Sequence, residues 1–283
     1  MKNLRVGGVP EHFNFPIHLC IEEGLFKKAG LNVEWVEFAE GTGAMNAALR
    51  ANEIDIAIIL TEGLVKDIAA GNTSKIIQNY VSSPLLWGVH VAEGSDFKII
   101  EDLKDTRPAI SRFGSGSHVM AFVQANQLGW DTSKIEPVVV NTLDNAVEML
   151  KKAEADYFMW EHFTTKPLVD GGIFRRVSNF PTPWSSFVIA ATQKAMDTNS
   201  ESLKIFLKVL NSKTAVFKEI PHIEELLSIR YEQQLPDIKK WISKTNWSQS
   251  QIPIEEIIRV QKHLLDLKMI DKELDTDFYL TII

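Results

Sequence analysis

The chain has 283 residues, of which 45% are hydrophobic and 24% are charged, and its formal net charge is −7. This length and apolar content suffice for two ordinary lobes with cores and exclude a disordered chain. The negative balance, without a concentrated basic segment, argues against a nucleic-acid-binding protein but permits a local pocket for a small anion. A single cysteine, Cys20, excludes an internal disulfide, and we expect it to be a small core residue rather than a catalytic one.

Strand and helix patterns alternate along the first 80 residues. A helix pattern covers residues 15–29. It ends in Lys27 and Lys28 followed by Gly30, which is typical of a helix C-terminus because glycine adopts the left-handed turn easily and lysines face the negative end of the helix dipole. Alternation at this spacing predicts a parallel or mixed sheet with helices on both faces. The expected strands are 4–9, 33–38, 54–60 and 75–80, and the further helices are 43–51 and 64–70.

A second α/β region follows a change of character at residues 82–84. The strand-like residues 86–91 can carry the chain to another lobe, and a return crossing fits 180–184, before the apolar run 187–191. Two crossings predict two lobes joined by hinge strands near 81–91 and 180–188, around a cleft lined by strand ends and helix starts. The strands expected within this region are 108–111, 137–140 and 156–160, and the helices are 100–104, the segment after 117, 143–155 and 166–170.

The C-terminal part, from Asn199 onward, is mainly helical in pattern. Pro221, Pro236 and Pro253 divide it into separate helices, because proline is tolerated only in a first turn. We expect this tail to pack on the first lobe. The first lobe then comprises residues 1–84 and 188–283, and the second lobe comprises residues 85–187.

Two segments of the first lobe carry a resemblance to a known family. They read EGLFKKAGLNVE at 23–34 and ALRANEIDIA at 48–57. In them the chain resembles the solute-binding proteins for sulfonates, taurine and nitrate, a family that also contains the fungal enzyme that makes the thiamine pyrimidine. The resemblance implies an α/β, two-lobed periplasmic-binding-protein type 2 fold, each lobe a mixed sheet flanked by helices, with the helical tail on lobe 1.

The strongest local chemistry lies at residues 111–118, where a strand ends in a small-residue turn before a helix. Backbone amides there meet the positive end of the helix, glycines let a ligand approach the main chain, and Arg112 can neutralise a carboxylate, sulfonate or phosphate. In the alternative, Ser115 or Ser117 merely caps its own helix. Because the resembled family holds its anion at the equivalent turn, we favour ligand contact by Arg112, Gly114, Ser115, Gly116 and Ser117.

The turn after the first strand carries both hydrogen-bonding and stacking groups. Glu11 or His12 can bind a nitrogen of a heterocycle, while Phe13 stacks on its face and Pro10 lies beside them. In the alternative, Phe13 is an anchor of the core. The sequence leaves these two interpretations open.

A third turn, with Thr61 and Glu62, follows the third expected strand. Glu62 lies near a helix start, where a carboxylate is electrostatically favoured in any case. Trp87 and Trp184 lie on the two expected crossings and are candidates for the floor of the cleft, although packing at the hinge explains them as well. We include Thr61, Glu62 and Trp184 among the expected ligand contacts.

Trp160 and Glu161 resemble the family's tryptophan–glutamate turn, after the strand that closes the second lobe. His162 stands where the family has a proline. The resemblance predicts the position of the turn in the chain but not its shape. The resemblance therefore implies ligand contact by Trp160 and Glu161.

Other kinds of site lack support. The seven histidines include no pair at the spacing of a zinc site, so we expect no metal. The glycine-containing segments 41–43 and 114–116 have neither the lysine of a phosphate-binding loop nor the spacing of a dinucleotide fingerprint, so we expect no cofactor. No serine lies in a nucleophile-elbow pattern.

The function that follows is that of a solute-binding protein that closes two lobes over a small anionic or heteroaromatic ligand, such as a sulfonate, a carboxylate or a thiamine precursor. It is either the substrate-binding type of an ABC transporter or a cytosolic relative. An enzyme on the same fold, of the menaquinone pathway or of thiamine-pyrimidine synthesis, is the alternative, with Glu62 or His12 as acid or base. The cysteine-rich iron-binding motif of the fungal enzyme has no counterpart, since Cys20 is the only cysteine.

Partners and localisation follow from the same features. We expect a small-molecule ligand, an ABC permease as a further partner, no nucleic acid and no membrane insertion. The chain enters a strand directly after residue 3, without a secretory signal, so we expect a cytoplasmic protein. A periplasmic or lipid-anchored protein is expected instead if a leader was removed.

Overall fold

The computed structural model describes all 283 residues, and the chain forms two compact units. Unit 1 comprises Met1–Pro84, Trp184–Leu265 and Ile270–Ile283, and unit 2 comprises Leu85–Pro183 and Asp266–Met269. The chain therefore passes four times between the units, and both units are discontinuous in sequence. The return falls at Trp184 instead of residue 188, and a short piece of the tail belongs to unit 2.

Unit 1 contains a five-stranded mixed sheet in the order β2-β1-β3-β10-β4. β1 pairs in parallel with β2 and β3, whereas β10 is antiparallel to β3 and β4. The central strands β3 and β10 are almost entirely buried, as their continuous aliphatic runs indicate. The strands are β1 (Lys2–Gly8), β2 (Leu31–Glu37), β3 (Ile56–Leu60), β4 (Lys75–Val81) and β10 (Phe187–Ala191).

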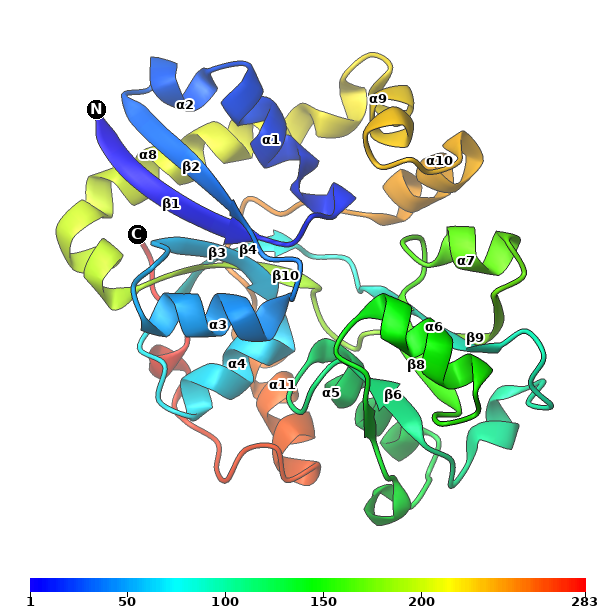
Figure 1. Ribbon diagram of the computed structural model, residues 1–283. Helices are drawn as coiled ribbons and strands as arrows, with labels where there is room; N and C mark the ends of the chain where they lie inside the picture. Colours follow the sequence, from blue (N-terminus) through cyan, green and yellow to red (C-terminus); the bar gives the residue numbers. More distant parts are fainter. The chain divides into compact units, whose positions relative to one another are not determined.

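Helices flank this sheet, and the helical tail belongs to unit 1 as expected. In Figure 1, α1, α2 and α8 lie along β1 and β2, whereas α3 and α4 pack together beside β3. The helices are η1 (His12–Asn14), α1 (Phe15–Glu22), α2 (Leu25–Lys28), α3 (Thr42–Arg50), α4 (Thr61–Ala69), α8 (Gln193–Val216), η4 (Phe217–Glu219), α9 (Ile223–Arg230), α10 (Leu235–Lys244), α11 (Ile254–Asp266) and η5 (Thr276–Phe278).

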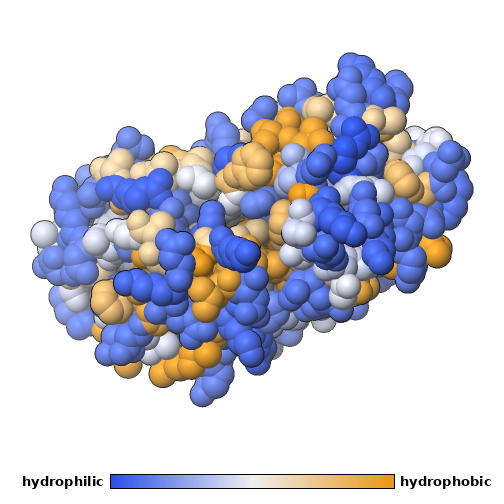
Figure 2. Space-filling view, turned by 90° about the horizontal axis from the view of Figure 1, so that it is seen from below, coloured by the Kyte–Doolittle hydropathy of each residue, from blue (hydrophilic) through white to orange (hydrophobic).

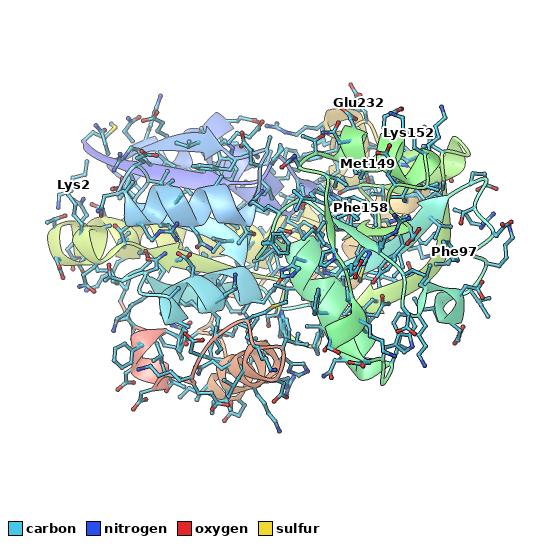
Figure 3. The ribbon with its side chains drawn as sticks, turned by 60° about the horizontal axis from the view of Figure 1, so that its bottom comes forward. Lys2, Phe97, Met149, Lys152, Phe158 and Glu232 are labelled. Atoms are coloured by element: carbon cyan, nitrogen blue, oxygen red, sulfur yellow. The ribbon has the colours of Figure 1, made fainter.

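Unit 2 repeats the same sheet topology, in the order β7-β6-β8-β5-β9. β6 is parallel to β7 and β8, and β5 is antiparallel to β8 and β9. Phe158 lies in its core, whereas Lys152, just after α6, projects outward (Figure 3). The elements are β5 (Leu86–Ala92), η2 (Ile100–Leu103), β6 (Pro108–Ile110), α5 (Gly116–Gln127), η3 (Thr132–Lys134), β7 (Val138–Val139), α6 (Leu143–Lys151), β8 (Tyr157–Glu161), α7 (Lys166–Asp170) and β9 (Phe174–Pro181).

Each unit contains an equivalent pair of arginine and aspartate that joins two of its own parallel strands. We call this pair the arginine–aspartate clamp. In unit 1, Arg5 donates from its backbone N (2.8 Å) and from Nη2 (3.0 Å) to the carboxylate of Asp55. In unit 2, Arg107 donates to Asp156 in the same way, at 2.8 and 2.9 Å. Such bidentate contacts fix the relative position of two chain segments. The clamp therefore holds β1 beside β3 and, in the same manner, β6 beside β8.

The residue three positions before each clamp aspartate has the same conformation and the same contact in the two units. Asn52 and Ala153 both have a left-handed backbone, with φ of 55°, and each accepts a hydrogen bond at 2.8 Å from its clamp arginine. The turns after β1 and β6 thus occupy equivalent positions in the two units, as do the turns after β3 and β8. The sequence-predicted site residues lie in these four turns, apart from Trp184 and Trp160, the latter being the penultimate residue of β8.

Three elements differ from the sequence-based expectation. The helix expected over residues 15–29 is broken at Gly24, whose φ of 67° ends α1 before α2 begins. The helix expected over 143–155 ends at Lys151, ahead of the left-handed Ala153. The eight-residue strand β9 was expected only as a crossing near its end.

One face of the molecule, shown in Figure 2, is mainly polar. Hydrophilic side chains dominate the face shown in Figure 2, and hydrophobic ones gather in separate patches among them. None of the helices combines the length and the apolar character that a membrane span requires.

Candidate functional site

The turn between β6 and α5 is held by three serine hydroxyls. Ser117 Oγ accepts from the backbone N of Ser111 at 3.0 Å and lies 3.0 Å from Ser115 Oγ. Ser115 is the N-cap of α5, because its Oγ accepts from the backbone N of His118 at 3.3 Å. The capping alternative therefore describes Ser115, and both hydroxyls are engaged within the turn rather than free for a ligand.

The backbone of this turn has features that are typical of an anion-binding site. Gly114 has a φ of 82°, and its backbone N donates to Nδ1 of His118 at 3.0 Å. Gly116 and Ser117 are the first residues of a twelve-residue helix, where amides have no intrahelical acceptor and the helix dipole is positive. Arg112 is half-buried beside them. The turn thus combines N–H groups at a helix start with a half-buried arginine in the same segment.

The turn after β1 contributes mainly to the core of unit 1. His12 and Phe13 are only 1% and 4% exposed, and their rings lie 4.2 and 5.2 Å from the ring of Trp241. This packing favours the core-anchor interpretation of Phe13 over stacking on a ligand. Burial lowers the pKa of His12 to about 3, so its imidazole is neutral. Pro10 is exposed and Glu11 half-buried, so these two remain accessible.

The turn after β3 places a buried acid at the start of α4. Glu62 is fully buried, and its Oε2 accepts from Nε1 of Trp184 at 2.9 Å. Its Oε1 has no hydrogen-bond partner. Burial raises the pKa of Glu62 to about 7, partly offset by the hydrogen bond from Trp184. Thr61 Oγ1 donates to the carbonyl O of Ser185 at 2.6 Å, which fixes the same turn.

The two tryptophans expected on the crossings are both buried. Trp184 is 2% exposed, and its ring lies edge-on to His263 of α11 at 5.4 Å. It thus orients Glu62 from a position 122 residues away in sequence. Trp87, in β5, is 4% exposed, and its Nε1 has no partner.

The turn after β8 is shaped by Glu161. Its Oε2 accepts from the backbone N of Phe163 (2.9 Å), and from the backbone N (2.6 Å) and Oγ1 (2.9 Å) of Thr164. Burial raises the pKa of Glu161 to about 7, although these hydrogen bonds lower it. Trp160 is half-buried and stacks on Phe158 at 5.3 Å. The carboxylate of Glu161 thus stabilises the conformation of the turn that follows it.

His162 belongs to a polar network that the sequence did not reveal. Its Nδ1 lies 2.6 Å from Oδ1 of Asn179, its Nε2 lies 2.9 Å from Nη1 of Arg176, and its carbonyl O accepts from Nη2 of Arg176 at 2.6 Å. Arg176 Nε also donates to Nε2 of His90 at 3.2 Å. Since Arg176 and Asn179 lie in β9, the replacement of proline by histidine at 162 was the only sequence signal.

The structure groups the expected site residues within each unit. In unit 1, Thr61, Glu62 and Trp184 form one cluster, whereas His12 and Phe13 belong to the aromatic core. In unit 2, the serine turn and the Glu161 turn follow the neighbouring parallel strands β6 and β8, so both lie at the carboxyl edge of that sheet. No group of three or more histidine, cysteine, aspartate or glutamate side chains is arranged to hold a metal ion.

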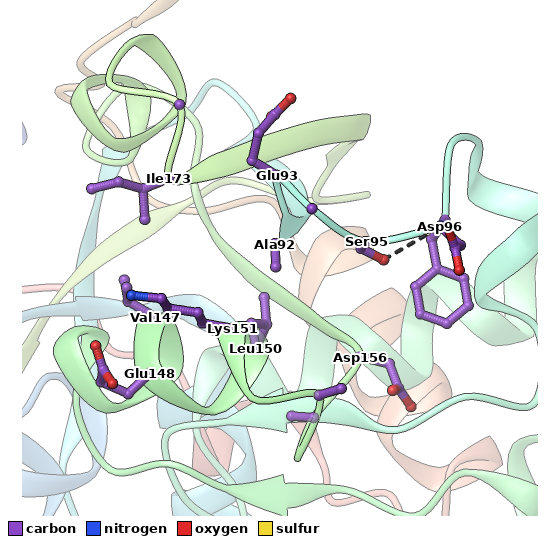
Figure 4. Close-up of a pocket in the computed structure, with 15 residues that line it drawn as sticks. Ala92, Glu93, Ser95, Asp96, Val147, Glu148, Leu150, Lys151, Asp156 and Ile173 are labelled. Atoms are coloured by element: carbon purple, nitrogen blue, oxygen red, sulfur yellow. Dashed lines mark hydrogen bonds between the residues drawn. The ribbon is translucent and has the colours of Figure 1, made fainter.

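A separate cavity of about 860 Å³ lies at the opposite edge of the sheet of unit 2 (Figure 4). In Figure 4, Ile173 and Glu93 lie on one side of it, and Val147 and Leu150 of α6 on the other. It is lined by residues beyond the end of β5 and before the start of β8, so it is distinct from the turns described above. Its position matches no site residue expected from the sequence.

Comparisons with known proteins agree with this architecture. Residues 87–180 match the family described as Ca3427-like PBP. The structure is similar to that of the Candida albicans CA3427 gene product, described as having the generic periplasmic-binding-protein fold, with a TM-score of 0.91 and 29% identity over 99% of this chain and 96% of that one. It is also similar to the alkanesulfonate-binding protein SsuA from Xanthomonas axonopodis pv. citri bound to MOPS, with a TM-score of 0.79 and 17% identity over 94% and 92% of the chains.

A curated relative of Bacillus subtilis (strain 168), named "Putative aliphatic sulfonates-binding protein", is 23% identical over 97% of this chain and 84% of its own length. The sequence resemblance thus extends over nearly the whole chain, beyond the two segments that first indicated it. The chain has the periplasmic-binding-protein fold and is similar to the Ca3427-like and sulfonate-binding proteins that share it.

Proposed function

We propose that this protein is a solute-binding protein that closes its two units over a small anionic or heteroaromatic ligand. Sulfonates, carboxylates and thiamine-precursor-like compounds are the ligand classes. In this proposal it acts as the substrate-binding component of an ABC importer, with a permease as its partner, or as a cytosolic relative of such a component.

The observation that carries the proposal is the preorganised turn at the start of α5. Ser111, Ser115 and Ser117 fix its backbone, so the first amides of the helix have their orientation before a ligand arrives. A sulfonate or carboxylate at this position gains N–H donors and the helix dipole without a large cost of reorganisation, and Arg112 in the same turn supplies a positive charge.

The relatives support the same ligand class. The names of the curated relative and of a solved structure refer to sulfonates, and the latter protein was bound to MOPS, itself a sulfonate. Fold alone does not decide function, so the ligand must be tested directly.

The test is thermal unfolding against sulfonates, nitrate, bicarbonate, pyrimidines, pyridoxal phosphate, thiamine precursors and aromatic carboxylates. A ligand that binds only the folded state raises the midpoint. For the anion that binds, Arg112→Ala should weaken binding by about 1.5–3 kcal/mol, whereas Lys134→Ala, which removes one exposed charge of the same unit, should not. Unchanged affinity in Arg112→Ala would remove this residue from the site, and no shift with any compound would contradict the proposal.

An enzyme on the same fold is the second candidate, because Glu62 is a buried acid with a pKa of about 7 and could serve as a general acid or base. Chemistry through Cys20 is disfavoured, since burial raises the pKa of its thiol to about 12. If the bound compound is turned over, Glu62→Gln should abolish turnover even at a saturating concentration of that compound. Turnover that persists in this variant would exclude the acid–base role.

A further inference from the structure

Glu62 leaves an acceptor atom without a donor in the interior of unit 1. The side chain is fully buried, and Trp184 Nε1 binds one carboxyl oxygen, Oε2, at 2.9 Å. The other oxygen, Oε1, has no hydrogen-bond partner. Buried polar atoms in folded proteins are nearly always paired, so an orphaned carboxyl oxygen calls for an explanation.

A second orphaned acceptor belongs to a side chain that contacts the residue after Glu62. Asn46 of α3 is 5% exposed, and its Nδ2 donates to the carbonyl O of Gly63 at 3.0 Å, directly next to Glu62 in the chain. Because only the amide nitrogen can donate to a carbonyl, the orientation of the side-chain amide is determined, and the remaining atom is the acceptor Oδ1. This Oδ1 also has no partner.

The start of α4, which carries Glu62, packs closely against α3, which carries Asn46. A Cβ on Gly63 would lie 2.3 Å from Cγ2 of Thr42 in the first turn of α3, so only glycine permits this approach of α3 to the start of α4. Trp184 in turn holds the carboxyl group of Glu62 from the other side. The side chains of both acceptors are thus each fixed by one hydrogen bond at the contact between α3 and the start of α4.

We propose that Glu62 and Asn46 form a subsite that accepts N–H groups, so that the ligand carries an amine, ammonium or amidine-like nitrogen in addition to its anionic group. This inference rests on the proposed function and narrows its ligand class from simple anions to amino-bearing ones. An N–H group on Oε1 supplies the missing donor, and a positively charged one also stabilises the ionised carboxylate that burial opposes.

The test compares ligand pairs that differ only in an amino group, by isothermal titration calorimetry on the full chain. The pairs are taurine with ethanesulfonate, β-alanine with propanoate, and 4-aminopyrimidine-5-carboxylate with pyrimidine-5-carboxylate. In whichever pair binds, the amino-bearing member should bind about tenfold to hundredfold more tightly, the range for a hydrogen bond to a charged group.

Glu62→Gln should abolish this preference, so that the two members of a pair bind with equal affinity. Trp184 Nε1 requires an oxygen opposite it, so the carbonyl of the new amide faces Trp184 and its NH₂ occupies the position of Oε1, where it opposes a ligand N–H. Asn46→Ala should reduce the preference in part. Glu53→Gln removes an exposed charge of the same unit and should retain the full preference.

The outcomes separate this inference from the proposed function. If anions bind but the wild-type protein shows no preference within any pair, the subsite is refuted while the binding function stands. If the preference persists in Glu62→Gln, the assignment of the acceptor is likewise refuted. If no member of any pair binds while another anion of the unfolding panel does, the subsite is refuted and the binding function stands. If no compound of that panel binds either, the proposed function fails, and the subsite fails with it. The wild-type comparison needs no variant, so the test holds even if a substitution prevents folding.

Discussion

Glu62→Gln should change how the stability of the protein depends on pH. Burial raises the pKa of Glu62 from an ordinary value of 4.5 to about 7 in the folded state. The folded protein therefore holds this proton more tightly than the unfolded chain does. The stability gained in this way is fully present below pH 4.5 and is lost as the pH rises through 7. The glutamine variant has no such proton and escapes this loss.

The magnitude follows from the two pKa values. Their difference of about 2.5 corresponds to about 3 kcal/mol of unfolding free energy. The unfolding free energy of Glu62→Gln minus that of the wild type should therefore rise by about 3 kcal/mol between pH 4.5 and pH 8. The glutamine carbonyl can still accept from Trp184, so the main contact of the side chain is kept.

Urea unfolding at intervals across this pH range measures the difference. Glu161 has a similarly raised pKa, but it is present in both proteins, and its contribution cancels in the subtraction. Glu53→Gln, which removes a carboxylate at an exposed position of the same unit, is the matched control. A difference between Glu62→Gln and the wild type that stays flat across the range would refute the inference that Glu62 is buried without a donor for Oε1.

Three further substitutions test the packing around the site. Phe13→Ala should lower the free energy of unfolding, measured with urea, by about 3–5 kcal/mol if the ring is a core anchor. A decrease of less than about 1 kcal/mol would instead favour the interpretation that Phe13 stacks on a ligand. Gly8→Ala should cost about 1–3 kcal/mol, because its Cβ would lie 2.2 Å from the ring of Trp35, and unchanged stability would show that this ring moves freely. Ser115→Ala should lower the free energy of unfolding by about 1 kcal/mol, because the side chain that caps the backbone N of His118 is lost. Unchanged stability would contradict a stabilising role of that hydrogen bond.

Much of the fold could be predicted from local patterns. The aliphatic runs of β3 and β10 and the βα alternation of unit 1 indicate a flanked sheet directly. The strand β9 is different, because its interior residues are mostly polar and half-buried at the edge of its sheet. The break between α1 and α2 depends on the left-handed conformation of Gly24. A glycine inside a helical pattern does not by itself predict that conformation.

Local sequence patterns indicated the turns that make up the candidate site, but not the contacts within them. Strand ends followed by small or polar residues located Glu62 and the serine turn. The partner of Glu62, Trp184, lies 122 residues away, and its role depends on the return of the chain into unit 1. Likewise, the network of His162 depends on Arg176, in a strand that the pattern did not show. Long-range contacts of this kind are set by tertiary structure, which no local pattern encodes.

An amide NMR titration tests most directly whether a small anion binds at the turn before α5. The protein is titrated with the panel anion that raises its unfolding midpoint most, and the backbone amide resonances are followed. We predict that the amides of residues 112–117 shift together with those of residues 61–63, while those lining the cavity of Figure 4, including residues 93–97, stay unchanged. Shifts confined to that cavity, or their absence at residues 112–117 at saturation, would contradict the proposed site.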